Sequence, residues 1–311
     1  MIRVIAPLLL ALAQPAGAFE LAFPADCTLG AGCYIQQYHD HDPGPSALDY
    51  TCGPMSYDGH DGTDIALPTR AEMAAGVAVL AAAPGVVKGL RDGIADAAPF
   101  PAGQDCGNGV VIDHGAGWET QYCHLKQGSV VVGTGDAVEV GTVLGQIGQS
   151  GRAEFPHLHF ALRQNGKAVD PFAPNATACG AARDDLWAGD LPHQPGGILG
   201  LGLTDQVPEF DAIKAGLPSP ILPASAPALV VWAYVFGPRA GDALIFEQTG
   251  PEGAVVTERV VFEKTQALAF RAVGRKLRGA EWAAGPYRGR VTMMRGAVEI
   301  GRQEIVITVG Q

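Results

Sequence analysis

Two histidines stand two positions apart in the stretch PHLHF (156–160), between apolar neighbours. On a strand, side chains at positions i and i+2 point to the same face, so His157 and His159 would lie side by side. Such a pair can hold one metal ion, or one ring can bind the metal while the other acts on a water molecule. The alternative is that both histidines belong to a polar strand face and bind nothing.

Further candidates for a metal site lie earlier in the chain. The stretch GHDGTD (59–64) contains His60 and Asp64, and QYCHL contains His124. On a straight strand His60 and Asp64 would be about 13 Å apart, whereas two donors of one zinc ion lie within roughly 4 Å of each other. A bend at Gly62 would bring them together. The HExxH motif of the helical zinc proteases is absent, which excludes that class.

Hydrolysis at a zinc site requires three protein ligands, an open position, a general base and a group that faces the oxyanion. The available side chains can fill each role once. We expect His60, Asp64 and His159 to be the zinc ligands. His157 would then be the base, and His124 would face the oxyanion.

Three motifs in this order carry a family resemblance. GHDGTD, VVIDHGAGWETQYCHL and SGRAEFPHLHFALRQNGKAVDPF contain H-x(3)-D, Y-x-H-L and H-x-H. Over about residues 50–175 the chain resembles peptidase family M23, the lysostaphin/LytM-type zinc endopeptidases. Two features depart from the pattern: the segment 91–107 looks like an insertion, and Ala161 stands where an acidic residue often follows H-x-H-F.

The resemblance implies a mainly antiparallel β domain with an active-site groove and one zinc ion per chain. It implies the same zinc ligands, His60, Asp64 and His159, and the same catalytic histidines, His124 and His157. Family members mostly cut the peptide stems or cross-links of peptidoglycan, so the expected substrate is peptidoglycan peptide. A second class of function remains open: a non-catalytic, exported LytM-type binding protein that activates other cell-wall hydrolases.

The elements that must position these residues read as strands. The chain has 42 glycines, 23 prolines and many short β-branched runs, which favours an all-β protein. Ile305, Ile307 and Val309 alternate near the C-terminus, as in a β-sandwich with an immunoglobulin-like fold. We therefore expect four parts: a signal peptide (1–18), a zinc peptidase domain (19–195), a Pro/Gly-rich linker (196–227) and a β-sandwich (228–311), whose partner the sequence does not identify.

The first residues predict export. Arg3 is followed by the apolar run 4–13 and by the small residues 16–18, the pattern of a secretory signal cleaved after Ala18. No later stretch is long and apolar enough for a membrane span. The formal net charge of −11 argues against nucleic acid and anionic membranes as partners. We expect a secreted or periplasmic protein.

Six cysteines in an exported chain suggest disulfides, and fifteen connectivities are possible. One pair follows from the strands: the segment 106–123 reads as a hairpin around HGAG, which would bring Cys106 and Cys123 together. The stretch YHDHD (38–42) also contains metal-binding residue types. We interpret it as a solvated acidic turn before Pro43 and Gly44.

Overall fold

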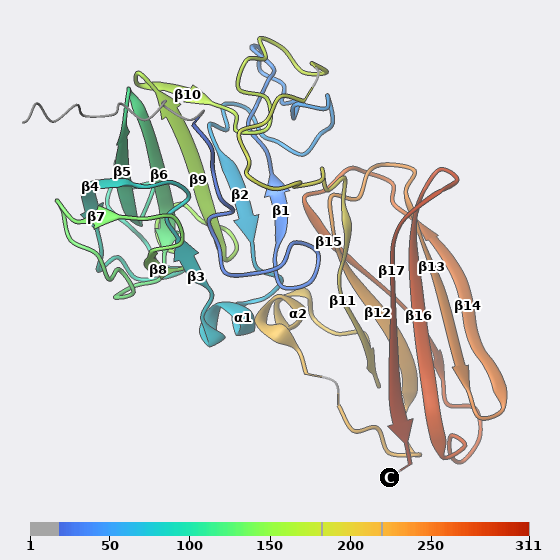
Figure 1. The fold of residues 1–311 in the computed structure, drawn as a ribbon. Helices are drawn as coiled ribbons and strands as arrows, with labels where there is room; N and C mark the ends of the chain where they lie inside the picture. The colour runs from blue at the N-terminus through green and yellow to red at the C-terminus, as the bar shows by residue number, and fades with distance from the viewer. Residues whose placement is uncertain (1–18, 182, 219, 311) are drawn as a thin grey trace, which may run out of the picture.

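A computed structural model describes residues 19–181, 183–218 and 220–310. In these ranges the chain forms antiparallel sheets and two short helices, α1 (Arg70–Ala75) and α2 (Phe210–Gly216), which confirms the all-β prediction (Figure 1). The predicted signal peptide, 1–18, lies outside the described residues. Neither helix in these ranges has the length and apolar character that crossing a membrane requires.

An eight-stranded sheet forms the N-terminal half, with the order β1-β2-β9-β6-β5-β4-β7 and β10 paired to β9. Its strands are β1 (Tyr34–Gln37), β2 (Thr63–Ala66), β4 (Gly85–Arg91), β5 (Asn108–Gly115), β6 (Trp118–Leu125), β7 (Ala137–Val138), β9 (His157–Gln164) and β10 (Lys167–Val169). A small second sheet pairs β3 (Ala78–Leu80) with β8 (Val143–Gln146).

Alternation along the central strands separates a core face from a polar face. Ile65, Tyr122 and Phe160 are fully buried in the core that this half of the chain encloses. On β9 the next side chains along the strand, His157 and His159, point to the opposite face, because successive residues of a strand alternate. His157, His159 and Asp64, which pairs with His159, therefore lie on the face that does not contain the main apolar core.

The C-terminal half contains two further sheets (Figure 1). One has the order β11-β12-β15 and the other β14-β13-β16-β17. The strands are β11 (Gly197–Thr204), β12 (Ala228–Phe236), β13 (Ala243–Gly250), β14 (Gly253–Val261), β15 (Leu268–Lys276), β16 (Gly285–Arg295) and β17 (Val298–Val309). Val231 of one sheet and Phe246 of the other belong to one buried cluster, so the two sheets share a core. An immunoglobulin-like connection order stays a prediction.

The stretch expected to be a linker contributes a strand. β11 pairs along its length with β12, and α2 follows it. The glycine content of this stretch predicts a linker, but its glycines lie in a paired strand. A Cβ at Gly202 would lie 2.3 Å from the Trp232 ring, so the missing side chain makes room for an aromatic residue of the neighbouring strand. Residues 197–204 thus belong to the C-terminal sheets, and the division into domains stays a proposal.

Direct contacts join the two halves. The rings of Tyr34 and Phe236 are 4.6 Å apart, and Phe236 belongs to the N-terminal core cluster. Gln36 Nε2 donates a hydrogen bond to the carbonyl of Ala267 at 3.1 Å. The C-terminal sheets therefore pack against β1, at the edge of the sheet beside β2.

The six cysteines form three disulfides, Cys27–Cys33, Cys52–Cys179 and Cys106–Cys123. The third joins the pair that the hairpin argument selects. Cys106 lies two residues before the start of β5 and Cys123 lies on β6, and these two strands pair as the predicted hairpin.

Candidate metal centre and active site

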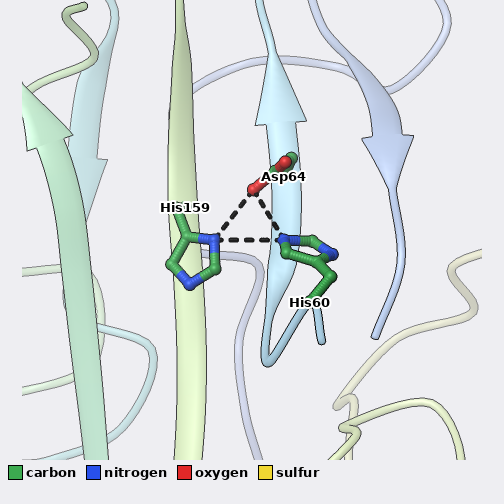
Figure 2. A group of neighbouring side chains, drawn as sticks. All are labelled: His60, Asp64 and His159. Carbon is green, nitrogen blue, oxygen red and sulfur yellow. Dashed lines mark hydrogen bonds and ion pairs between the residues drawn. The ribbon is translucent and has the colours of Figure 1, made fainter. Parts of the chain in front are cut away.

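Three donor atoms converge where β2 lies beside β9. Asp64 on β2 stands directly opposite His159 on β9, and His60 lies just before β2. The distances are 2.9 Å from His159 Nδ1 to Asp64 Oδ1, 3.1 Å from His60 Nε2 to Asp64 Oδ1, and 3.2 Å between the two ring nitrogens. Figure 2 shows this triangle, with all three side chains pointing to its centre.

The chain reaches this geometry by a bend at Gly62. Its φ is not in the left-handed region that favours glycine, so the requirement is for space. A Cβ at Gly62 would lie 2.7 Å from His159 Cε1 and 2.7 Å from the carbonyl oxygen of Phe160. Gly62 therefore lets the His159 ring lie over the bend between His60 and Asp64.

The remaining ring nitrogens have acceptors of their own. His60 Nδ1 lies 2.7 Å from the carbonyl oxygen of Tyr38, and His159 Nε2 lies 3.3 Å from Asp61 Oδ1. Carbonyl and carboxylate oxygens can only accept hydrogen bonds, so His60 Nδ1 and His159 Nε2 each carry the hydrogen. The nitrogens that face Asp64 consequently offer lone pairs, the arrangement typical of metal-binding histidine.

The donor set fits zinc. Three bonds of about 2.0–2.1 Å in tetrahedral geometry separate the donors by about 3.3–3.4 Å, close to the distances in the triangle. Two lone pairs and a carboxylate that converge this closely repel one another unless a positive charge lies between them. His60, Asp64 and His159 are thus suited to hold one divalent cation, with room for a further ligand.

Two more histidine rings adjoin the triangle. His157 Nε2 lies 3.6 Å from Asp64 Oδ1, and the rings of His157 and His124 are 4.6 Å apart. In both rings Nδ1 donates to a main-chain carbonyl, that of Phe155 at 2.9 Å for His157 and that of Ser150 at 2.8 Å for His124. Both rings therefore keep Nε2 free to accept a proton.

Burial sets the protonation of these rings. It lowers the pKa of His124 to about 3, with a further contribution from the nearby His157, and it also lowers the pKa of His157. Burial acts in the same direction on His159, but hydrogen bonds to Asp61 and Asp64 outweigh it and raise the pKa of His159 to about 9. A cation held in the triangle would replace that proton.

The Cys106–Cys123 disulfide braces this site. His124 has a left-handed backbone conformation, with φ of 63°, and its N–H donates to the carbonyl of Cys106 at 2.8 Å. A non-glycine residue in this region costs on the order of 1–3 kcal/mol. The hydrogen bond to Cys106 and the neighbouring disulfide therefore hold His124 in a backbone conformation that is otherwise unfavourable.

We expect the double variant Cys106→Ala/Cys123→Ala to lose about 3 kcal/mol of stability, because the bridge closes a loop of this size. We also expect a loss of activity of up to about 10²-fold, since His124 would shift. Zinc content should stay unchanged, because the three ligands lie elsewhere. Thermal unfolding, turnover and metal analysis measure the three effects.

The matched control is Cys27→Ala/Cys33→Ala, which opens a bridge with a sequence separation of only 6. It should leave turnover unchanged. Equal turnover in both double variants would contradict the bracing role of Cys106 and Cys123.

The YHDHD stretch is not a solvated turn. His41 Nε2 lies 2.7 Å from Asp170 Oδ2, and Asp40 accepts from the N–H groups of Leu48 and Gly59. Asp40 N–H also donates to the carbonyl of His60 at 2.8 Å. The stretch is half-buried and positions the turn before His60. Within the described ranges, His60, Asp64 and His159 are the only group of three such side chains that converges on one point.

Sequence reasoning missed two neighbours of the site. Asp61 accepts from His159 and also lies 3.6 Å from Arg163. The ring of Tyr57 lies 4.4 Å from that of His60 and is half-exposed. Asp61 directly follows the predicted ligand His60. Its position in the sequence does not distinguish an acidic residue that contacts His159 from one that faces the solvent.

Known proteins resemble the part of the chain that contains this site. DD-carboxypeptidase/endopeptidase Mpg of Neisseria meningitidis is 38% identical over 114 residues, which are 36% of this chain and 22% of Mpg. Peptidoglycan DD-endopeptidase ShyA of Vibrio cholerae is 34% identical over 116 residues, 37% of this chain and 23% of ShyA. The chain thus spans less than a quarter of the length of these relatives.

Among solved structures, a mutant catalytic domain of the prophage-encoded M23 protein EnpA from Enterococcus faecalis is similar at 26% identity. The match covers 50% of this chain and 96% of that domain, with a TM-score of 0.33. The sequence model of Peptidase family M23 matches residues 58–171, a range that contains the three donor residues of the triangle and the two further histidines. This match confirms, for residues 58–171, the resemblance to peptidase family M23 that the three motifs predict.

Proposed function

We propose that this chain is a zinc-dependent endopeptidase, exported from the cytoplasm, that hydrolyses peptide bonds in the stems or cross-links of peptidoglycan. The convergence of His60, Asp64 and His159 beside two further histidines is the observation that supports it most. The names of Mpg and ShyA, which describe peptidases, support the same class of reaction.

The zinc ligands would be His60, Asp64 and His159. When bound, zinc supplies the Lewis acidity that polarises the scissile carbonyl. Asp61 and the carbonyl of Tyr38 keep the two ligand rings oriented, because each accepts the hydrogen of the nitrogen that does not bind metal.

His157 is the proposed general base. Burial keeps its ring neutral near pH 7, and the bond from Nδ1 to Phe155 leaves Nε2 open beside Asp64. Nε2 accepts a proton as a water molecule adds to the scissile carbonyl carbon. The same proton then passes to the amide nitrogen, the C–N bond breaks, and the products are a carboxylic acid and an amine.

His124 is the proposed partner of the oxyanion. Its neutral ring offers only a lone pair at Nε2, because Nδ1 donates to Ser150. Negative charge that develops beside Nε2 favours the charged ring, which takes up a proton from the solvent and donates it in a hydrogen bond to the oxyanion. That proton returns to the solvent when the oxyanion collapses. His124 thus contributes mainly in the transition state and little in the ground state.

Metal removal tests the proposal. A chelator should abolish lysis of purified sacculi, and added zinc should restore it. Asp64→Ala should weaken zinc binding by at least about 100-fold, since even partners outside the ligand set contribute 10–100-fold. Chelator competition measures the affinity, and mass analysis of the released fragments identifies the bond that is cut.

Asp58→Ala is the matched control, because Asp58 is exposed and lies only two residues before His60. It should keep full zinc affinity and activity. Full zinc occupancy of Asp64→Ala would refute the ligand assignment. Binding of sacculi with no release of fragments would instead support the second class of function, a non-catalytic activator of other hydrolases.

A further inference from the structure

The sheet face that carries the proposed zinc site continues beyond β9. Directly opposed residues of antiparallel strands point to the same face. Cys123 on β6 is opposite His159, and Gly109 on β5 is opposite Arg91 on β4. The register shifts between Asn108 and Val110, because β6 has one extra residue opposite Gly109. Gly109 lies next to the disulfide, since a Cβ there would lie 2.9 Å from Cys106 Sγ. One row across the sheet therefore leads from the zinc site to Arg91.

A cavity of about 200 Å³ lies at the end of this row. The cavity exists because Gly89 and Gly109 have no side chains to fill the space above the sheet. Val111, which also lines it, adds an apolar surface. Cys106 of the disulfide and Gln121 of β6 also line it. The cavity has room for one small residue of a peptide.

Arg91 is the charged group of this cavity. Its guanidinium donates to the carbonyl of Gly107 at 3.2 Å, which uses one of its five N–H donors. Within the described ranges no carboxylate forms an ion pair with Arg91, whereas two other basic side chains of the sheet are paired: Arg163 with Asp61, and Lys88 with Glu119. Arg91 is exposed and keeps most of its donors open.

The spacing suits a peptide. From β9 to β4 there are three strand spacings, about 14 Å. An extended chain advances about 3.3 Å per residue, so about four residues span this distance. A peptide that crosses the strands with its scissile bond at the zinc site would place a group three to four residues away at Arg91.

We propose that Arg91 and this cavity form a subsite for a carboxylate of the substrate, three to four residues from the cleaved bond. The proposal rests on the proposed endopeptidase function and adds the substrate class: a peptide with a free carboxylate at that distance. The planar guanidinium matches a carboxylate in a two-bond geometry. Either a C-terminal carboxylate or an acidic side chain supplies this chemistry.

The test uses the full zinc-loaded chain and synthetic peptides with the stem sequence of the sacculi. One pair differs only in a C-terminal carboxylate or carboxamide, and a second pair only in Glu or Gln at the fourth residue from the cut. We expect the matching acid to have a kcat/KM about 5–20-fold higher than its amide, mostly through KM. The pair that shows the difference identifies the source of the carboxylate.

Arg91→Ala should lower kcat/KM for the acid to the value of its amide and leave the amide unaffected. Arg91→Lys should retain part of the preference, and zinc content should not change. Arg275→Ala, which removes an exposed arginine of the C-terminal sheets, should behave like the wild type. Equal losses on acid and amide in Arg91→Ala, or equal kcat/KM for both pairs in the wild type, would overturn the subsite.

A binding measurement separates this proposal from the function on which it rests. Affinities of the acid and amide peptides for the His157→Ala variant are compared by fluorescence polarisation. If the wild type cuts no peptide, the endopeptidase proposal fails. A binding preference for the acid that depends on Arg91 still supports the subsite in that case, and equal binding of both forms refutes it.

Discussion

Replacing His157 by alanine is expected to reduce kcat by about 10²–10⁴-fold, the usual loss when a general base is removed, while one zinc ion per chain stays bound. The reason is the position of the ring: Nε2 faces Asp64 at 3.6 Å, outside the triangle of closer donors. The variant removes a proton acceptor and leaves all three ligands in place. Turnover of a soluble peptide and metal analysis of the same sample measure the two effects.

His159→Ala is the matched comparison, since it removes the same ring two residues further along β9. That variant should lose zinc and activity together. The two results separate a base from a ligand on one strand. If His157→Ala also loses its metal, the roles of the two histidines are wrongly divided.

Gly62→Ala should impair zinc binding although Gly62 is not itself a proposed zinc ligand. The added Cβ would lie 2.7 Å from His159 Cε1, so the ring or the bend must move. A displacement of about 1 Å at such a site can cost about 10²-fold in rate. We expect zinc affinity to fall by about 10–100-fold, as chelator competition would show, and activity to fall with it.

Gly189→Ala provides the control, because a Cβ at Gly189 meets no atom within 4 Å and its φ is not in the left-handed region. It should match the wild type in zinc affinity and turnover. Unchanged zinc affinity in Gly62→Ala would show that His159 has more freedom than the structure indicates.

The candidate site could be predicted from sequence because its donors recur at fixed spacings. His157 and His159 share a strand face by alternation alone, and His60 needed only a bend to reach Asp64. The contacts of Asp61 and Arg91 could not be predicted in this way. Asp61 depends on which side of the bend faces His159. Arg91 depends on a bulge in β6, where Cys123 and His124 face Gly109 of β5 and so align Gly109 with the disulfide.

The fold class also followed from local signals, whereas the status of β11 did not. Short runs of β-branched residues predict strands whose own side chains pack into a core. The strand β11 instead leaves space for Trp232 of β12, so its glycines carry information about a partner far along the chain. Composition cannot distinguish such glycines from those of a flexible linker.

The Cys52–Cys179 disulfide has a consequence for survival among proteases. The three proposed zinc ligands and the two proposed catalytic histidines all lie between these two cysteines, so the bridge closes these five residues into one covalent ring. A single cut at the exposed residues 101–103 opens the ring but releases no fragment. In the reduced protein the same cut would separate His60 and Asp64 from His159 into two chains, held together only by non-covalent contacts such as the pairing of β2 with β9.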